Sequence, residues 1–328
     1  MRVYSLFRYF FLCVALSLIA REDVRFKEWV SEVAPPWFTG SLLSFSPLVL
    51  PVGHMDFEPY LFAIANTGVY NDDWESKSIP TFWVNSFATL IQAGVAPRLD
   101  MQIFPTLIWN HCQDKGHWAV GDLPFYVDLQ LYYADVGGWA PNVKFMVTEI
   151  IPLGKYRNLN PHDHRTEIGG LGSWQTNIAI VLGNVHYLGK GHYLQYRVIL
   201  NYDLLAPVRV TGFNVYGGGY GANARLFPGQ IITFLTSAEV SLSQNWCFSI
   251  DLVGEWGSSD HYTGFSGILP TGETAPLGRP SSAQFSMAPA IEYNWSSNLG
   301  IIGGAWFSVA GRNSDVFQGG VVALNYLY

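Results

Sequence analysis

Apolar and polar residues alternate one by one along much of the chain. From Ala283 to Trp295, large apolar residues occupy every second position, and small or polar residues occupy the positions between them. Successive side chains of a β-strand point to opposite faces, so a period of two predicts strands with one apolar and one polar face. The same alternation recurs in the segments that begin at Leu123, Tyr193, Ile231 and Asn245.

The alternation predicts about twelve strands over the whole chain. The connections between them alternate in length: residues 66–78, 160–173, 206–228 and 256–280 are long, whereas 95–98, 188–191, 243–245 and 296–298 are short. Long loops on one side and short turns on the other are typical of outer-membrane β-barrels. The predicted strands begin near Met55, Thr81, Leu99, Leu123, Val143, Gln175, Tyr193, Ile231, Trp246, Phe285, Leu299 and Phe317.

The composition supports a membrane-embedded fold. Only 13% of the 328 residues are charged and 16% are aromatic, whereas soluble domains carry about 25% charged residues. After the N-terminus no apolar run reaches the roughly 20 residues that a membrane-spanning helix needs. Lipid offers no partner for backbone polar groups, so a closed barrel is the other spanning solution. The predicted fold class is all-β, a transmembrane antiparallel β-barrel of about twelve strands.

The first residues resemble an export signal. Arg2 and Arg8 precede an apolar stretch, residues 9–20, and charged residues follow it at once. This pattern predicts a cleaved secretory signal peptide at residues 1–20, and therefore a location in the outer membrane. Without Arg2 and Arg8, the formal net charge of −7 becomes about −9, and an acidic chain without a basic stripe argues against nucleic acid as a partner.

Residues 21–53 do not follow the strand pattern, and the barrel is expected at residues 54–328. Glu22–Val33 has helical character, and Pro35 and Pro36 end it. The segment is interpreted either as a short helical plug inside the barrel or as a periplasmic tail. Apolar side chains left in water favour the plug. The candidate plug residues are Trp29, Val30, Val33, Trp37 and Phe38.

The chain ends on an alternating apolar row with a C-terminal aromatic residue. Leu324, Tyr326 and Tyr328 continue the period of two to the last position. Such endings are typical of proteins that the outer-membrane barrel assembly machinery inserts. This machinery and outer-membrane lipid are therefore expected partners.

Charged residues at inward-facing positions are mostly acidic. They predict a lumen that repels anions and favours cations or neutral solutes. Alternatively, these groups pair with one another inside a narrow or plugged barrel, because twelve strands enclose little more than their own side chains. The candidate lumen-lining residues are Asp56, Glu58, Asp122, Asp128, Arg197, Glu239, Asp251 and Glu292.

An enzymatic interpretation is the least favoured. Outer-membrane proteases activate water with carboxylate and histidine pairs at the extracellular rim, and a histidine beside a carboxylate can act as a general base. The same residue types are common in solvated loops, and the sequence predicts no catalytic residue, no metal site and no cofactor. The pairs in question are Asp72-Asp73, Asp163-His164 and Asp260-His261.

Four short motifs resemble the phenol-degradation meta-pathway transporter-like family of outer-membrane proteins. They are residues 121–124 (GDLP), 151–156 (IPLGKY), 169–173 (GGLGS) and 288–293 (APAIEY). Leu153 stands where the family more usually has threonine. The resemblance covers roughly residues 55–328 and implies a barrel that carries small, often aromatic or hydrophobic compounds. It implies no catalytic residues.

The sequence thus predicts an outer-membrane channel for the passive passage of a small solute. A surface-structural or adhesive barrel without transport is the alternative. Solute flux separates them, because an adhesin gives none.

Overall fold

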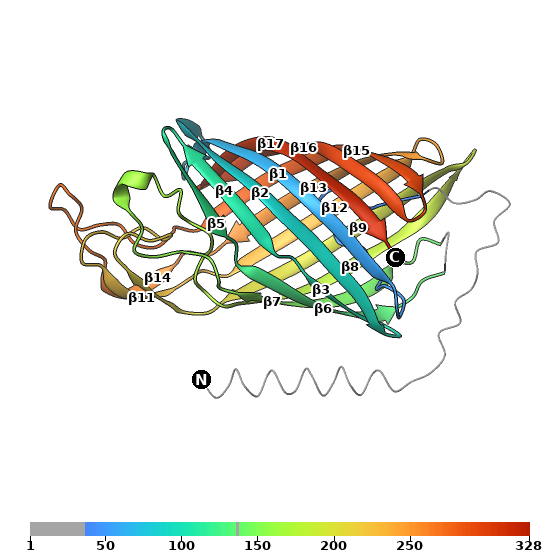
Figure 1. Ribbon diagram of the computed structural model, residues 1–328, viewed down its shortest axis with the longest axis horizontal. Coiled ribbons are helices and arrows are strands. Elements are labelled where there is room, and N and C mark those ends of the chain that lie inside the picture. The colour runs from blue at the N-terminus through green and yellow to red at the C-terminus, as the bar shows by residue number, and fades with distance from the viewer. Residues whose placement is uncertain (1–36, 136–137) are drawn as a thin grey trace.

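Twelve antiparallel strands close into one barrel in the computed structural model, which describes residues 37–135 and 138–328 (Figure 1). This confirms the predicted all-β transmembrane barrel. The barrel strands are β1 (Met55–Tyr70), β2 (Ser76–Ala96), β3 (Leu99–Ile103), β6 (Leu123–Tyr132), β7 (Asn142–Ile151), β8 (Gln175–Gly189), β9 (His192–Leu205), β12 (Ile231–Ser241), β13 (Trp246–Gly257), β15 (Ser282–Ser296), β16 (Leu299–Arg312) and β17 (Ser314–Leu327).

The first and last strands complete the barrel. β1 pairs with β17 over its whole length and with β2 on its other side. At the end of this seam, the Met55 N–H donates to the Tyr328 carbonyl at 2.9 Å, and the Tyr328 N–H donates to the Met55 carbonyl at 2.8 Å. Both ends of the barrel therefore lie on the side of the short turns, which is the periplasmic side of such barrels.

The third predicted strand is broken in two. β2 pairs with β3 near the periplasmic end and then with β4 (Thr106–Cys112), because the chain bends at Phe104 and Pro105. Proline has no backbone N–H to give to the ladder, so a break at this position is expected. β4 forms a hairpin with β5 (Lys115–Val120), which runs on into β6.

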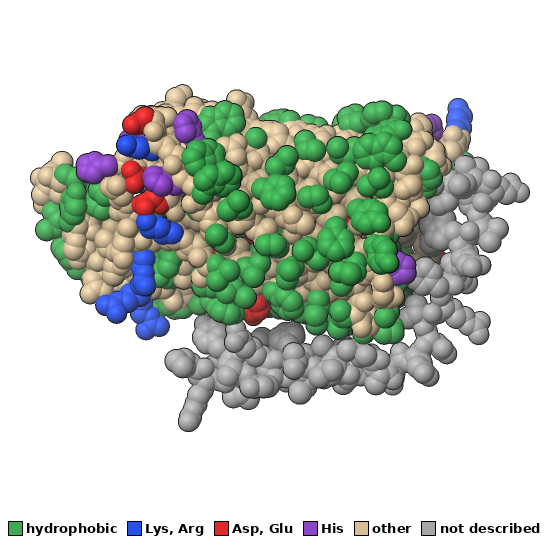
Figure 2. Space-filling model, viewed as in Figure 1, with side chains coloured by type: hydrophobic (Ala, Val, Ile, Leu, Met, Phe, Trp, Pro, Cys, Tyr) green, Lys and Arg blue, Asp and Glu red, His purple; other side chains and the backbone are tan. Residues whose placement is uncertain are grey.

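Alternation of the two faces is clear in β13 and β15. Phe248 and Ile291 are cross-strand partners and point outward, whereas the neighbouring Ser249 and Ala290 are buried on the inner face. Figure 2 shows that such outward side chains form a broad apolar belt on the face of the barrel in view, and exposed apolar residues on the other strands extend it. An exposed apolar surface of this extent requires lipid around it. In the part of the chain that the structure describes, no helix has the length and apolar character to cross a membrane.

The predicted alternation of connection lengths holds with exceptions. On the periplasmic side, the chain between the end of β6 and the start of β7 is longer than the other turns, and the β4–β5 and β16–β17 hairpins turn tightly on the extracellular side. Two predicted loops also contain strands of their own. β10 (Val208–Thr211), β11 (Asn223–Phe227) and β14 (His261–Phe265) form a three-stranded sheet beyond the barrel.

Candidate functional site

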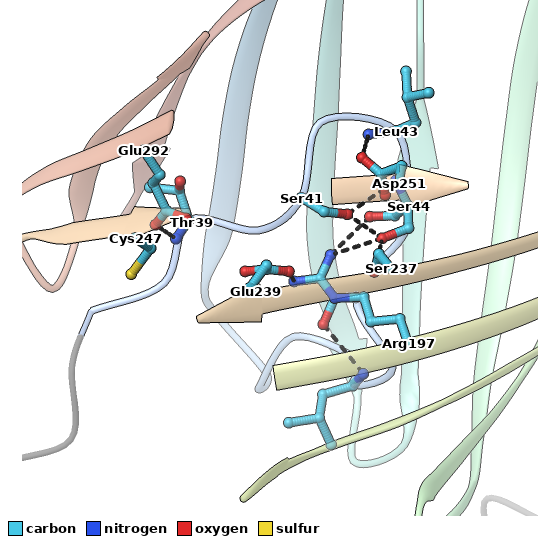
Figure 3. A network of polar contacts seen from close by, with 12 residues as sticks. Thr39, Ser41, Leu43, Ser44, Arg197, Ser237, Glu239, Cys247, Asp251 and Glu292 are labelled. Carbon is cyan, nitrogen blue, oxygen red and sulfur yellow. Dashed lines mark hydrogen bonds and ion pairs between the residues drawn. The ribbon is translucent and has the colours of Figure 1, made fainter. Parts of the chain in front are cut away.

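An extended segment, residues 39–50, lies inside the barrel; we call it the luminal segment (Figure 3). It enters from the periplasmic side, where the Trp37 N–H donates to the Gln244 carbonyl at 3.3 Å in the β12–β13 turn. The Asn294 side-chain amide donates to the Trp37 carbonyl at 2.9 Å. The segment rises into the lumen and returns to the periplasmic side at the start of β1. It has no helical turn; the predicted helix, Glu22–Val33, lies outside the described residues.

The rising half of the luminal segment contacts the β9–β15 side of the barrel. The Thr39 N–H donates to the Glu292 carboxylate, and the Leu43 N–H donates to Asp251 Oδ2 at 3.1 Å. These bonds satisfy backbone groups that a segment without secondary structure would otherwise leave unpaired in a dry interior.

The apex of the luminal segment is held by Arg197 on β9. Arg197 Nη1 donates to the Ser44 carbonyl at 2.8 Å. The hydroxyls of Ser44 and Ser237, the latter on β12, lie 2.9 Å apart. The luminal segment, β9 and β12 therefore meet at one buried point, as Figure 3 shows.

The returning half contacts the opposite wall. The Val49 N–H donates to Gln130 Oε1 on β6 at 2.9 Å, and the Leu50 N–H donates to Asp100 Oδ2 on β3 at 2.8 Å. The Gln130 side-chain amide also donates to the Pro47 carbonyl at 3.1 Å. The luminal segment thus spans the lumen from one wall to the other.

Inward-facing glycines make room for this segment. A Cβ on Gly94 of β2 would lie 2.0 Å from the Pro51 carbonyl oxygen, and a Cβ on Gly300 of β16 would lie 2.0 Å from Thr39 Cγ2. Neither position tolerates a side chain without displacement of its neighbour. Glycine in a strand often marks such a close approach of another backbone.

Two buried ion pairs lie beside the luminal segment. Arg197 Nη2 is 2.9 Å from Glu239 Oε1, and Lys144 Nζ is 2.8 Å from Asp128 Oδ2. Asp128, Lys144 and Glu239 are fully buried. Charges taken out of water in this way require close partners, so removal of one member is costly.

Carboxylates outnumber cations in this half of the lumen. Among the described residues that line it, seven carboxylates face only Lys144 and Arg197. Some of their oxygens, such as Asp100 Oδ1 and Asp128 Oδ1, have no hydrogen-bond donor within the described chain. The seven are Asp56, Glu58, Asp100, Asp128, Glu239, Asp251 and Glu292.

The two acidic residues on β1 lie close together near the seam. The Asn325 amide on β17 donates to both Asp56 oxygens at 3.0 Å and to Glu58 Oε1 at 2.8 Å. Glu58 also accepts the hydroxyl proton of Tyr60 at 2.6 Å. These residues belong to the same inner face as the ion pairs.

Asp122 has a different role from the one its position in the sequence predicts. Its carboxylate accepts the backbone N–H groups of Gly154 and Leu171, each at 2.8 Å. A Cβ on Gly154 would lie 2.3 Å from the backbone of Gly169. Three of the motifs that resemble the transporter-like family, residues 121–124, 151–156 and 169–173, therefore meet at one point. Asp122 clamps an extracellular loop to the β5–β6 junction instead of lining the lumen.

The luminal segment carries apolar side chains at its apex. Leu42 is buried in a cluster with Ala290, Ile302 and Val321, and Leu43 packs beside it. Phe45 lies against the Tyr126 ring on β6, with ring centroids 5.4 Å apart. The polar network therefore has an apolar cover on its extracellular side.

Aromatic side chains line the lumen beyond this apex. We call Tyr60, Phe62, Phe104, Trp306 and Phe317 the aromatic wall. The Tyr60 ring stacks on Phe62 with centroids 5.6 Å apart, and it meets the Phe104 ring edge-on at 5.6 Å. On the neighbouring strands, the rings of Trp306 and Phe317 are 5.0 Å apart. Tyr60, Phe62, Phe104 and Trp306 are only partly buried. One side of the lumen above the luminal segment, on β1, β16 and β17, is thus lined by aromatic surface.

Sequence analysis did not identify several of these residues. Asp100, Gln130 and Lys144 bind the luminal segment or its ion pairs, and each occupies an inward position in an alternating strand. The lone lysine among the apolar residues 143–147 was the available signal. Of the candidate plug residues, Trp37 and Phe38 lie at the entrance of the luminal segment. Trp29, Val30 and Val33, like the predicted signal peptide, lie outside the described residues.

The candidate protease residues hold loops together. Asp260 accepts the Gly229 and Arg279 N–H groups, each at 2.8 Å, and Asp72 accepts from the Asn313 amide at 3.0 Å. Asp163 Oδ2 lies 3.8 Å from His117 Nε2. Within residues 37–135 and 138–328, no three His, Cys, Asp or Glu side chains are grouped to hold a metal ion.

No protein-family model matches the chain, and no curated protein matches it. The fold is similar to the crystal structure of an outer-membrane channel from Pseudomonas putida F1, with a TM-score of 0.65 and 13% identity, over 88% of this chain and 100% of that one. Two other barrels have TM-scores of 0.43. They are the porin NanC, 7% identical over 83% of this chain and 98% of that one, and the translocator domain of the Neisseria meningitidis autotransporter NalP, 10% identical over 83% and 88%. At 13% identity the first likeness shows a shared barrel fold, and the other two are too distant to carry an inference.

Proposed function

We propose that this protein is an outer-membrane channel for the passive entry of small neutral solutes with aromatic or hydrophobic character. The aromatic wall carries the proposal. Channels that conduct water-soluble solutes have a polar interior, whereas here Tyr60, Phe62, Phe104 and Trp306 offer ring surface to the lumen. Aromatic surface of this kind favours a solute that can stack on it.

Charge and width refine the solute class. The excess of carboxylates around the luminal segment repels anions, as acidic rings do in cation-selective pores. The luminal segment itself reduces the cross-section available to a solute. Small molecules without negative charge therefore fit this lumen best, in agreement with the transporter-like family that the motifs resemble.

Export, membrane insertion and partners are part of the same proposal. The signal peptide at residues 1–20 and the terminal Leu324, Tyr326 and Tyr328 support delivery to the outer-membrane assembly machinery. In the folded barrel these three terminal side chains lie exposed on the outer face of β17. They are therefore accessible to such a machinery and, afterwards, to lipid.

Uptake by whole cells tests the proposal, because lipopolysaccharide slows the diffusion of aromatic solutes through the outer membrane itself. Cells that produce the barrel should accumulate a radiolabelled aromatic compound faster than cells without it. The variant Phe62→Ala with Trp306→Ala should lower this rate about fivefold or more, from the loss of two ring contacts of about 0.5–1.5 kcal/mol each.

Phe57→Ala is the matched control, because Phe57 follows the outward positions of the same strand. Its uptake rate should equal that of the unaltered barrel. Liposomes that contain the purified barrel should in addition swell in a small sugar. An adhesive or purely structural barrel would give neither uptake nor swelling, and either result alone would contradict that alternative.

A further inference from the structure

The small sheet beyond the barrel has two unlike faces. Val208, Val210, Ala224 and Leu226 are buried against the extracellular loops. In that core, the Tyr216 hydroxyl donates to the Leu171 carbonyl at 3.0 Å, and burial raises its pKa, so it stays a donor. The other face of the sheet is exposed.

Two arginines oppose each other on this exposed face. Arg209 on β10 and Arg225 on β11 are direct cross-strand partners. Like charges in this arrangement destabilise a sheet. Arg157 lies nearby, with Nη1 donating to the Arg209 carbonyl at 3.4 Å. We call these three residues the arginine face.

No carboxylate compensates this charge. Within the described residues, no Asp or Glu oxygen lies within 4.0 Å of the guanidinium of Arg157, Arg209 or Arg225; the arginines and lysines that have such a partner are Lys115, Lys144, Lys155, Arg197, Arg279 and Arg312. Arg209 Nε and Nη2 instead donate to Asn223 Oδ1, at 3.4 and 3.2 Å. A chain with a net charge of −7 thus gathers uncompensated positive charge at one place.

The arginine face borders an open cleft of about 360 Å³. Arg209 and Arg225 line it, and Asn223 and Thr263 add an amide and a hydroxyl group. Guanidinium groups donate several hydrogen bonds in one plane, a geometry that suits phosphate oxygens. The cleft therefore fits a phosphate group better than a lone carboxylate or a neutral solute.

The position of the cleft identifies the source of that phosphate. β10, β11 and β14 continue β9, β12 and β13 past the edge of the apolar belt, where Leu204 and Ile232 are the last outward aliphatic residues of their strands. Arg209 is five positions after Leu204, which is at most about 17 Å of extended chain. In Figure 2, Lys and Arg side chains gather at this edge, between the belt and the outermost loops. The headgroups of the outer leaflet occupy the same level.

We propose that the arginine face binds the phosphate of an outer-leaflet glycolipid headgroup. The inference rests on the proposed outer-membrane location but not on solute transport. Arg209 and Arg225 donate to the phosphate oxygens, and Arg157 adds positive charge beside them. The like-charge pair, unfavourable in the free protein, is stabilised when the anion binds.

Binding of lipid A to the purified full barrel in detergent tests the proposal. Phosphorylated lipid A should bind, and R209Q with R225Q should weaken it about tenfold or more, from the loss of charge-assisted hydrogen bonds. Arg98→Gln is the control, because Arg98 is an arginine at the opposite, periplasmic rim; its affinity should equal that of the unaltered barrel. Dephosphorylated lipid A should bind as weakly to the unaltered barrel as phosphorylated lipid A binds to the double variant.

Three results would overturn the proposal. One is equal affinity of the double variant and the unaltered barrel for phosphorylated lipid A. A second is equal affinity of the unaltered barrel for both lipid forms. A third is full displacement of the lipid by millimolar inorganic phosphate, which would make the cleft a site for a soluble anion. The double variant should keep the normal uptake rate of the aromatic solute, so failure of lipid binding and failure of transport are separate results.

Discussion

The periplasmic and extracellular halves of the lumen carry different residue types at their inward-facing positions. The periplasmic half is filled by the luminal segment, and the extracellular half carries the aromatic wall. On β1, Asp56 and Glu58 lie near the periplasmic end, and Phe62 lies further along the same face. On β16, Gly300 accommodates the luminal segment, whereas Trp306 lies in the aromatic wall. On β1 and β16 the alternation runs regularly between these positions, so the residue type decides. Polar residues and glycine bind the luminal segment in one half, and aromatic residues offer ring surface to a solute in the other.

The largest expected effect is on stability, and it follows from removing the central contact between the luminal segment and the barrel wall. Arg197→Met removes the partner of Glu239 and of the Ser44 carbonyl, so that buried groups are left uncompensated. We expect unfolding in urea to require about 3–5 kcal/mol less free energy. The double variant R197M/E239Q should recover part of this loss. If Arg197→Met were as stable as the unaltered barrel, the contacts of Arg197 with Glu239 and the luminal segment would contribute little to the free energy of unfolding.

The next effect separates the lumen from the lipid face. Ile291→Arg places a charge in the apolar belt and should lower the free energy of unfolding in lipid by about 2–4 kcal/mol. Ile268→Arg is the matched control, because Ile268 is 42% exposed, close to the 46% of Ile291, but lies in an extracellular loop. Its effect should stay within about 0.5 kcal/mol. Equal losses would contradict the assignment of the belt.

A smaller effect is expected where the luminal segment approaches the wall. A Cβ at Gly94 would collide with the Pro51 and Leu50 carbonyl oxygens, so Gly94→Ala should cost about 1–3 kcal/mol and raise single-channel conductance. Gly303→Ala should change neither quantity, because its nearest neighbour would be 3.6 Å away. Unchanged conductance in Gly94→Ala would show that the luminal segment does not limit passage.

The smallest effect concerns the two free cysteines, which mark opposite ends of the barrel. Cys112 ends β4 at the extracellular side, and Cys247 begins β13, where its thiol donates to the Trp37 carbonyl at 3.5 Å. A membrane-impermeant thiol reagent on intact cells should label Cys112 faster than Cys247. No disulfide should join them, because the bilayer core is about 30 Å thick and a disulfide needs Cα atoms within about 7 Å.

Local pattern was sufficient to predict the barrel wall. Strands begin at Leu99, Leu123, Gln175, Ile231 and Leu299, where the alternation predicts them. The period of two is a local property, and burial of one face enforces it. The break at Pro105 was missed, although a proline inside a strand pattern indicates one.

The luminal segment could not be predicted in the same way. It has no periodicity, and its partners, such as Asp251 and Glu292, are more than 200 positions away. Its fit depends on inward glycines, Gly94 and Gly300, which read as ordinary small residues in the sequence. Asp122 was assigned to the lumen for a related reason. It lies just before a predicted strand, where the alternation favours an inward-facing side chain. Only the folded loops show that its carboxylate accepts the N–H groups of Gly154 and Leu171.

The bond from Thr39 to Glu292 joins positions 253 residues apart, and this separation dictates an order of folding. Contacts so distant in sequence form only after the intervening chain has been arranged, because loop closure costs entropy before the contact repays it. Thr39 therefore docks after β15 is in place. The seam that closes the barrel joins residues still farther apart, such as Asp56 and Leu327, so the same argument places closure of the wall no earlier than the docking of Thr39. The barrel and its contents are therefore completed together, and the last strand closes around a lumen that the protein's own chain already occupies.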